Sequence, residues 1–297
     1  MDKKIHYLSR YRFNISGFST IQNDVELEGY LQTKSEFSPE GKLILQETFD
    51  SNEQLEQRNT YTYNEHGNLI SEAVWFDDNS PAEKRELKYD EKQQITEEQV
   101  HYETGGVDLI TYEYSANGEL IKKTTQDDEG EVESITEWTH TNGKIKTERV
   151  LGVDNNELIF KQYTYSDKGD ILQVEYRDSD ENRAYTTFHE YNKQNQHIKS
   201  RVINDNNQLI ERYAYQYDDK NQLIEYIEET ALRLRKIIHE YDEAGRTILQ
   251  EEYDKNDLLV SRSEFEYDEN GLQISNNTGN TRTGENYILK DEYEFYE

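Results

Sequence analysis

The chain of 297 residues contains no cysteine, and this absence removes several classes of site at once. Disulfide bonds, thiolate metal sites and cysteine nucleophiles are all excluded. The first thirty residues also lack an uninterrupted apolar stretch, so neither a signal peptide nor a membrane span is expected. The sequence therefore predicts a cytoplasmic protein without membrane contact.

Apolar residues and basic residues are both scarce. Only 33% of the residues are hydrophobic, too few for the thick core of a compact domain of this length. The 63 Asp and Glu residues outnumber the 33 Lys and Arg residues and give a net charge of -30. Such a field repels nucleic acid and attracts basic proteins. We therefore expect a basic protein partner, no nucleic acid and no membrane.

What the chain does contain is a turn that recurs every 24 to 26 residues, from Phe13–Gly17 to Tyr267–Gly271. The turn reads aromatic, Asp/Asn/Ser, any, any, Gly, and a fixed period of this size is the signature of a repeat protein. Its fifth position needs a positive φ to close a hairpin, which favours Gly or Asn. Gln93 is the one misfit. The structural turn residues are Gly41, Gly67, Gly118, Gly143, Gly169, Asn195, Asn221, Gly245 and Gly271.

Each turn is flanked by segments with the alternation of β-strands. Aromatic and polar residues alternate ahead of the turn, as in Tyr163-Thr-Tyr165, and an aliphatic pair such as Leu69-Ile70 follows it. A looser polar turn, such as Asp50-Ser-Asn52, then leads to the next repeat. One repeat is therefore one antiparallel hairpin, and the 24 tyrosines and 9 phenylalanines supply rings that stack between hairpins.

The sequence predicts an all-β fold, an elongated antiparallel β-meander of about eleven hairpin repeats of ~26 residues each. The repeat runs through the whole chain, so residues 1–297 are expected to form a single repeat domain. Residues 1–17 are expected to form an N-terminal cap and residues 285–297 a terminal capping strand. About 23 strands in one layer would twist into a superhelix or trough, and the sequence leaves an open superhelix and a closed shell as alternatives, of which the open form is predicted.

Catalytic and metal-binding constellations are not recognisable. The segment Asp178–Asn182 copies the start of an EF-hand loop, but Arg183 stands where that loop needs Gly, and His189 where it needs Glu. His189 and His239 occupy aromatic positions of the repeat and are interpreted as replacing tyrosine in the stacking ladder. The sequence predicts no catalytic residue, no metal and no cofactor.

The repeated core resembles two bacterial families. Tyr63-Asn-Glu-His-Gly67-Asn-Leu69 and Tyr267-Asp-Glu-Asn-Gly271-Leu resemble the YD repeats of bacterial RHS proteins, although the period is longer here. The core is also similar to the MORN-type repeats of a family of bacterial antitoxins found beside polymorphic toxins. RHS repeats form a shell around a toxin, and the likeness to the antitoxins implies neutralisation of one.

Two hypotheses of function follow. The first is a cytoplasmic immunity protein or antitoxin whose acidic surface captures a basic toxin domain. The alternative is a carbohydrate or cell-surface binding module that uses the tyrosine ladder as a stacking platform. Enzyme activity is not expected, and the oligomeric state is left open. The candidate binding residues are the paired strand tyrosines Tyr61, Tyr63, Tyr112, Tyr114, Tyr163, Tyr165, Tyr215 and Tyr217.

Overall fold

The computed structural model describes residues 4–15, 28–76 and 80–297, and these residues are antiparallel strands joined by turns, with no helix among them. The predicted all-β class is therefore confirmed. The strands belong to one 22-stranded sheet. The chain divides into two compact units, one of Met1–Asn59 with Tyr213–Glu297 and one of Thr60–Arg212. The single repeat domain over residues 1–297 stays a prediction.

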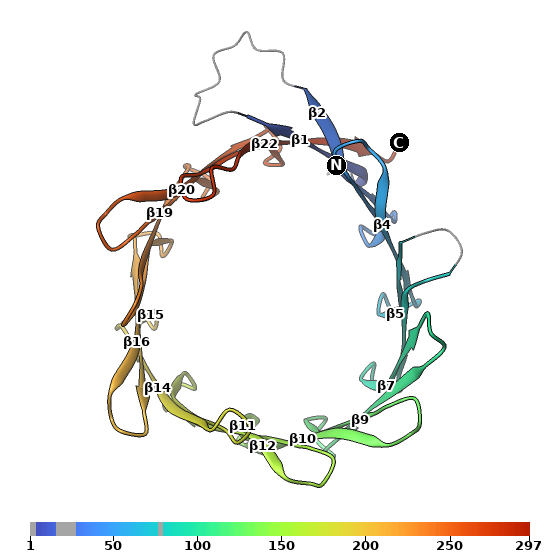
Figure 1. Ribbon diagram of the computed structural model, residues 1–297, viewed down its shortest axis with the longest axis vertical. Helices are drawn as coiled ribbons and strands as arrows, with labels where there is room; N and C mark the ends of the chain where they lie inside the picture. Colours follow the sequence, from blue (N-terminus) through green and yellow to red (C-terminus); the bar gives the residue numbers. More distant parts are fainter. Residues whose placement is uncertain (1–3, 16–27, 77–79) are drawn as a thin grey trace. The chain divides into compact units, whose positions relative to one another are not determined.

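The strands follow one another as hairpins in both units (Figure 1). The first unit holds β1 (Ile5–Asn14), β2 (Gly29–Phe37), β3 (Leu43–Phe49), β17 (Leu223–Thr230), β18 (Leu234–Tyr241), β19 (Thr247–Tyr253), β20 (Leu259–Tyr267), β21 (Gln273–Asn280) and β22 (Asn286–Phe295). The second holds β5 (Leu69–Trp75), β6 (Glu83–Tyr89), β7 (Ile95–Tyr102), β8 (Val107–Tyr114), β9 (Leu120–Gln126), β10 (Val132–Thr141), β11 (Lys144–Leu151), β12 (Glu157–Tyr165), β13 (Ile171–Asp178), β14 (Arg183–Tyr191) and β15 (His197–Asn204). The strands β4 (Leu55–Tyr63) and β16 (Leu209–Tyr217) carry the chain from one unit to the other.

The aromatic turns of the described residues share one hydrogen-bond pattern, except the turn between β10 and β11. At the second turn, the Gly41 amide donates to the Ser38 carbonyl at 2.8 Å and the Ser38 amide donates to the Lys42 carbonyl at 2.7 Å. The side chain at the second turn position accepts from nearby amides, as Ser38 Oγ does from Glu40 at 3.2 Å. The fifth position has positive φ, +82° at Gly41 and +66° at Asn221, and even the misfit Gln93 adopts +64°.

The turns at the opposite ends of the strands that begin at Asp50, Asp127, Asn204 and Asp254 share this pattern and are as tight as the aromatic turns, not looser as predicted. The turn after Asp178 is closed differently, by a bond from the Glu181 amide to Asp178 Oδ1, and the turn expected over Asp77–Asn79 lies outside the described residues. The Glu53 amide donates to the Asp50 carbonyl at 3.0 Å, while Asp50 Oδ1 accepts from the amides of Asn52 and Gln54. Positive φ recurs at Glu53, at +59°. An Asp or Asn side chain at the first position stabilises such a turn by accepting hydrogen bonds from two backbone amides. A sequence pattern based on glycine does not detect this stabilisation.

One turn departs from the repeat. Between β10 and β11 only Asn142 and Gly143 form the loop, and both have positive φ, +54° and +73°. Asn-Gly with two positive φ values is the sequence of a type I′ hairpin turn. The repeat signature over Thr139–Gly143 had indicated the longer turn, and His140 at its second position was the sign of the difference.

The hairpins form a single layer in which few side chains are fully removed from solvent. In the β12–β13 hairpin, Tyr163 and Tyr165 pair with Val174 and Ile171 on one face, while Gln162 pairs with Glu175 on the other. We call these the tyrosine face and the polar face. The buried apolar side chains are Ala73, Val100, Leu151, Val202, Ile237, Val260 and Ile288.

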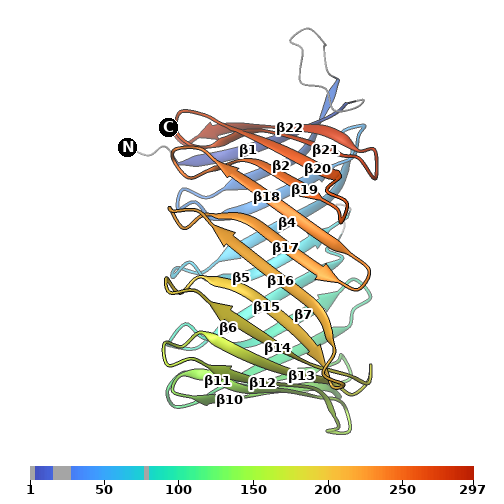
Figure 2. The ribbon, with the colours of Figure 1, turned by 90° about the vertical axis from the view of Figure 1, so that its left-hand side faces the viewer.

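The prediction of an open meander or superhelix is wrong, because the first strand pairs with the last. β1 pairs antiparallel with β2 and also with β22, where Ser9 lies opposite Glu292 (Figures 1 and 2). A sheet whose first and last strands pair has the closed topology of a β-barrel. Closure satisfies the backbone amides and carbonyls that two open edges would expose.

Both expected terminal caps are strands of this closure. Residues 5–14 of the expected N-terminal cap form β1, and β22 occupies residues 286–295 of the expected capping strand. Residues 1–3, 16 and 17 of the cap lie outside the described residues, as does the strand expected to follow Gly17. The described part of the chain contains no helix with the length and apolarity that crossing a bilayer requires.

Candidate functional site

The tyrosines that begin the aromatic turns, among them the candidate binding residues Tyr114 and Tyr165, are hydrogen-bonded to the backbone of the sheet. In seven repeats the hydroxyl at this position donates to the carbonyl of the second residue after the preceding aromatic turn, at 2.7–2.9 Å. Burial raises the pKa of Tyr114 and of Tyr165. Each of these hydroxyls therefore forms a hydrogen bond that joins two consecutive hairpins. The donors are Tyr89, Tyr114, Tyr165, Tyr191, Tyr241, Tyr267 and Tyr293.

The tyrosines two residues earlier lie beside ion pairs. The Tyr112 hydroxyl donates to Glu98 Oε2 at 3.0 Å, and Glu98, which is buried, also accepts from Arg85 Nε at 2.8 Å. Burial and the neighbouring Glu98 charge raise the pKa of Tyr112 to about 12. Tyr163 lies near a similar pair, in which Lys161 donates to Glu148 at 2.8 Å, and burial raises its pKa.

The eight candidate tyrosines do not come together at one place. They lie in pairs on β4, β8, β12 and β16, and other strands separate these four. Tyr215 packs against Tyr226, with ring centroids 5.3 Å apart. Tyr61 and Tyr63 lie half-buried on β4. Tyr163 and Tyr165 line a groove.

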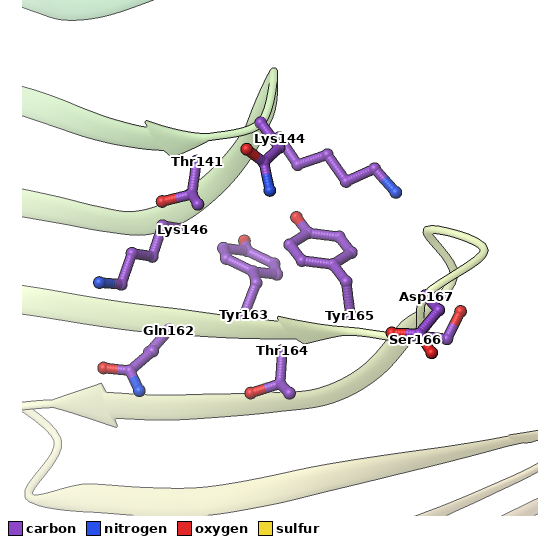
Figure 3. A pocket seen from close by; sticks show the side chains of 10 residues that line it. Thr141, Lys144, Lys146, Gln162, Tyr163, Thr164, Tyr165, Ser166 and Asp167 are labelled. Atoms are coloured by element: carbon purple, nitrogen blue, oxygen red, sulfur yellow. The ribbon is translucent and has the colours of Figure 1, made fainter.

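This groove has a volume of about 610 Å³ and lies beside the ends of β10, β11 and β12 (Figure 3). The rings of Tyr163 and Tyr165 stand side by side on the tyrosine face, with centroids 6.5 Å apart and planes inclined by 20°. Polar groups and two lysines complete the lining. The groove residues are Thr141, Asn142, Lys144, Lys146, Gln162, Tyr163, Thr164, Tyr165, Ser166 and Asp167.

Lys144 and Lys146 make the groove locally basic in an acidic protein. Neither forms an ion pair with a carboxylate in the described part of the chain. Lys144 Nζ lies 5.1 Å from the centroid of the Tyr165 ring, within reach of a cation–π interaction. A Cβ at Gly169 would lie 1.6 Å from this nitrogen. Gly169 therefore leaves room for the lysine besides adopting a φ of +96°.

A second groove of about 580 Å³ lies across the next aromatic turn and shares Ser166 and Asp167 with the first. His189 and Tyr191 of β14 line it, together with Leu172 of β13. Among residues 4–15, 28–76 and 80–297, no cluster of three or more His, Asp or Glu side chains is arranged to hold a metal ion. The absence of a catalytic residue stays a prediction.

Sequence reasoning missed Lys146 and His197, although both break the repeat. Lys146 stands where other repeats have the second residue of the aliphatic pair, as in Ile121 or Leu172, and His197 replaces the first. Positions that break a local rule are where functional residues concentrate. Comparison of equivalent positions could therefore have identified both.

Comparisons with known proteins give limited likenesses. A family model described as an uncharacterised protein matches residues 179–297. No curated protein matches the chain.

Two solved structures are similar at low identity. The crystal structure of TcdB2-TccC3-TEV is 11% identical with a TM-score of 0.43, covering 84% of this chain, which spans 16% of that chain. A porin-like protein from Bacteroides uniformis ATCC 8492 is 10% identical with a TM-score of 0.33, covering 98% of both chains. Neither likeness reaches a level that supports a shared activity.

Proposed function

We propose that this protein is a protein-binding scaffold that captures a basic partner, as an immunity protein or antitoxin captures a toxin domain. The observation that carries the proposal is the net charge of -30, contributed by acids throughout the repeats. A field of this sign attracts cationic surfaces over about 10 Å at 0.1 M salt and accelerates their association.

Exposed aliphatic side chains beside exposed acids support the proposal. Ile248 and Ile274 follow equivalent aromatic turns and are 36% and 37% exposed. Glu240 and Glu266 immediately precede the turn tyrosines of the same hairpins and are also exposed. Apolar anchors surrounded by charge are the usual form of a protein interface. A cytoplasmic address and the absence of membrane and nucleic-acid binding belong to the same proposal.

The closed sheet also limits how a partner is recognised. Because β1 pairs on both sides, it offers no free edge to which an extended peptide could add as a further strand. Recognition then depends on side chains at the turns and on the two faces. This favours a folded partner with a complementary charged surface over a strand-like peptide.

The proposal is tested by capturing partners from the native host with the intact chain, purifying the protein retained, and measuring its association kinetics with the same chain. We expect a basic protein whose association rate falls steeply with salt, while its dissociation rate changes little. Glu240→Lys with Glu266→Lys should slow association, and the matched Glu240→Asp with Glu266→Asp should not. A neutral or acidic partner, or association unaffected by salt and by charge reversal, would refute the proposal.

The groove at Tyr163 and Tyr165 favours a second candidate function, the binding of a saccharide. Two nearly parallel rings offer a stacking platform, and hydroxyl, amide and ammonium groups around them can bind sugar hydroxyls. Titration with defined oligosaccharides, followed by tyrosine fluorescence, tests it. Binding that is lost in Lys146→Glu and kept in Lys193→Glu, which changes a turn lysine outside the groove lining, would support it. An unchanged fluorescence at every concentration would exclude it.

A further inference from the structure

Two histidines on neighbouring strands point their ring nitrogens at each other. His189 lies on β14 and His197 begins β15, and their Nδ1 and Nε2 atoms are 3.3 Å apart. Ser200 Oγ lies 2.9 Å from the first and 2.8 Å from the second. The Lys199 carbonyl oxygen lies 3.0 Å from His197 Nε2. The two ring nitrogens and the Ser200 oxygen therefore lie within 3.3 Å of one another, and the Lys199 carbonyl oxygen lies beside the His197 nitrogen.

We propose that His189 and His197, with Ser200 completing the site, bind a divalent transition-metal ion such as Zn²⁺. Nitrogen ligands in a tetrahedral zinc site lie about 3.3 Å apart, because each is about 2.0–2.1 Å from the metal. The same arrangement places the two ring centroids about 5.2 Å apart. The observed separations are 3.3 Å and 5.1 Å, so both rings can be directed at a shared ion.

The chemistry of the donor atoms selects the class of ion. Imidazole nitrogen suits Zn²⁺, Cu²⁺ and Ni²⁺, whereas Mg²⁺ and Ca²⁺ prefer oxygen ligands alone. His189 also lines the 580 Å³ groove, from which water can supply a remaining ligand.

The repeat supplies a matched control in His239. This residue occupies the position of His189 in another hairpin, but it lies opposite Gln250 and stacks on Tyr241, with centroids 6.4 Å apart. No described imidazole faces it. The pair at His189 therefore differs from the ordinary repeat by the substitution of His197 for an aliphatic residue and by the small Ser200 beside it.

Calorimetric titration of the intact, untagged chain with ZnCl₂ tests the proposal. We expect one Zn²⁺ per chain, no binding of Mg²⁺, and a loss of affinity of at least about tenfold in His189→Gln and in His197→Gln, because each removes one of two imidazole ligands. His239→Gln should bind as the unmodified chain does. No zinc binding by the unmodified chain, or equal binding by His189→Gln, would overturn the proposal and leave a hydrogen-bonded histidine pair.

A measurement on the unmodified chain covers the case in which a substitution prevents folding. Zn²⁺ should protect His189 and His197, but not His239, from modification by diethylpyrocarbonate, as read by mass spectrometry. Equal modification of all three with and without Zn²⁺ would overturn the proposal.

Discussion

At the scale of the residue, the tyrosines are shared between structure and surface. The turn tyrosines fix neighbouring hairpins through their hydroxyls, as Tyr165 does at the Ile145 carbonyl, 2.7 Å away. Their rings cover the sheet while one edge meets solvent, which lets a single layer hold together with few buried aliphatic residues. Tyrosines predicted to bind a partner, such as Tyr114 and Tyr165, therefore contribute to the stability of the sheet.

The left-handed turn position yields a direct test. Gly41 has a φ of +82° and open space around its Cβ direction, so only backbone strain opposes a side chain there. Gly41→Val should lower the free energy of unfolding by about 1–3 kcal/mol, measured by urea denaturation. Gly41→Asn should be mild, because Asn195 and Asn221 already adopt this conformation. Equal effects of the two substitutions would refute the assignment of the turn.

Tyr112 predicts a pH dependence of stability. Its pKa rises to about 12 in the folded protein, by burial and by the Glu98 charge, from 10.0 in the unfolded chain. The folded state thus favours the protonated phenol, and this contribution is complete below pH 10 and is lost as the pH rises to about 12. Urea midpoints should fall more steeply over this window in the unmodified chain than in Tyr112→Phe. Parallel profiles would contradict the assignment.

At the scale of the element, how much of the fold the sequence predicts depends on how local the interaction is. The hairpin and the positive φ of its fifth position depend on five adjacent residues, and the sequence contains the whole signal. The tightness of the second set of turns is not predicted because most of these turns, such as the one at Asp50, lack the recurring glycine of the aromatic turns. Hydrogen bonds to the Asp50 side chain stabilise this turn. The pairing of β1 with β22 joins strands at opposite ends of the chain, and no local pattern reports it.

The candidate site shows the same limit. Tyr163 and Tyr165 were identified because they follow the repeat, whereas Lys146 and His197 were missed because they depart from it. A repeat pattern identifies the residues that all hairpins share, and these residues pack the strands against one another. What distinguishes one hairpin from another is visible only when the register places the unusual side chains together, as it does for His197 and His189.

The ion pair that crosses from β1 to β22 predicts an asymmetric response to mutation. Arg10 donates to both Asp291 oxygens at 2.7 Å, and the Asp291 side chain is only 2% exposed while that of Arg10 is 34% exposed. Arg10→Ala leaves a buried carboxylate without its partner and should cost about 3 kcal/mol of unfolding free energy. Asp291→Ala should cost less, because the guanidinium can be hydrated. Calorimetry or urea denaturation decides this, and a larger cost for Asp291→Ala would be contrary to the burial described.

At the scale of the whole molecule, closure decides what the protein can offer a partner. Its first and last strands pair with each other, so a binding partner contacts the acids, rings and aliphatic side chains of the faces and turns. The proposed capture of a basic protein and the proposed metal site both depend on side chains that the strand register brings together. The pairing of β1 with β22 is therefore the central structural claim.

One disulfide tests that claim most directly, and the absence of native cysteine makes the experiment clean. Ser9 and Glu292 are opposite partners on β1 and β22, so Ser9→Cys with Glu292→Cys should form an intramolecular disulfide under mild oxidation, seen by mass spectrometry. Ser9→Cys with Ser275→Cys should stay reduced, because β22 lies between β1 and β21, and Cα atoms two strands apart are about 9.6 Å from each other. Rapid formation of the first disulfide and not of the second is the predicted result. A reduced first pair in the folded monomer would contradict the closed sheet.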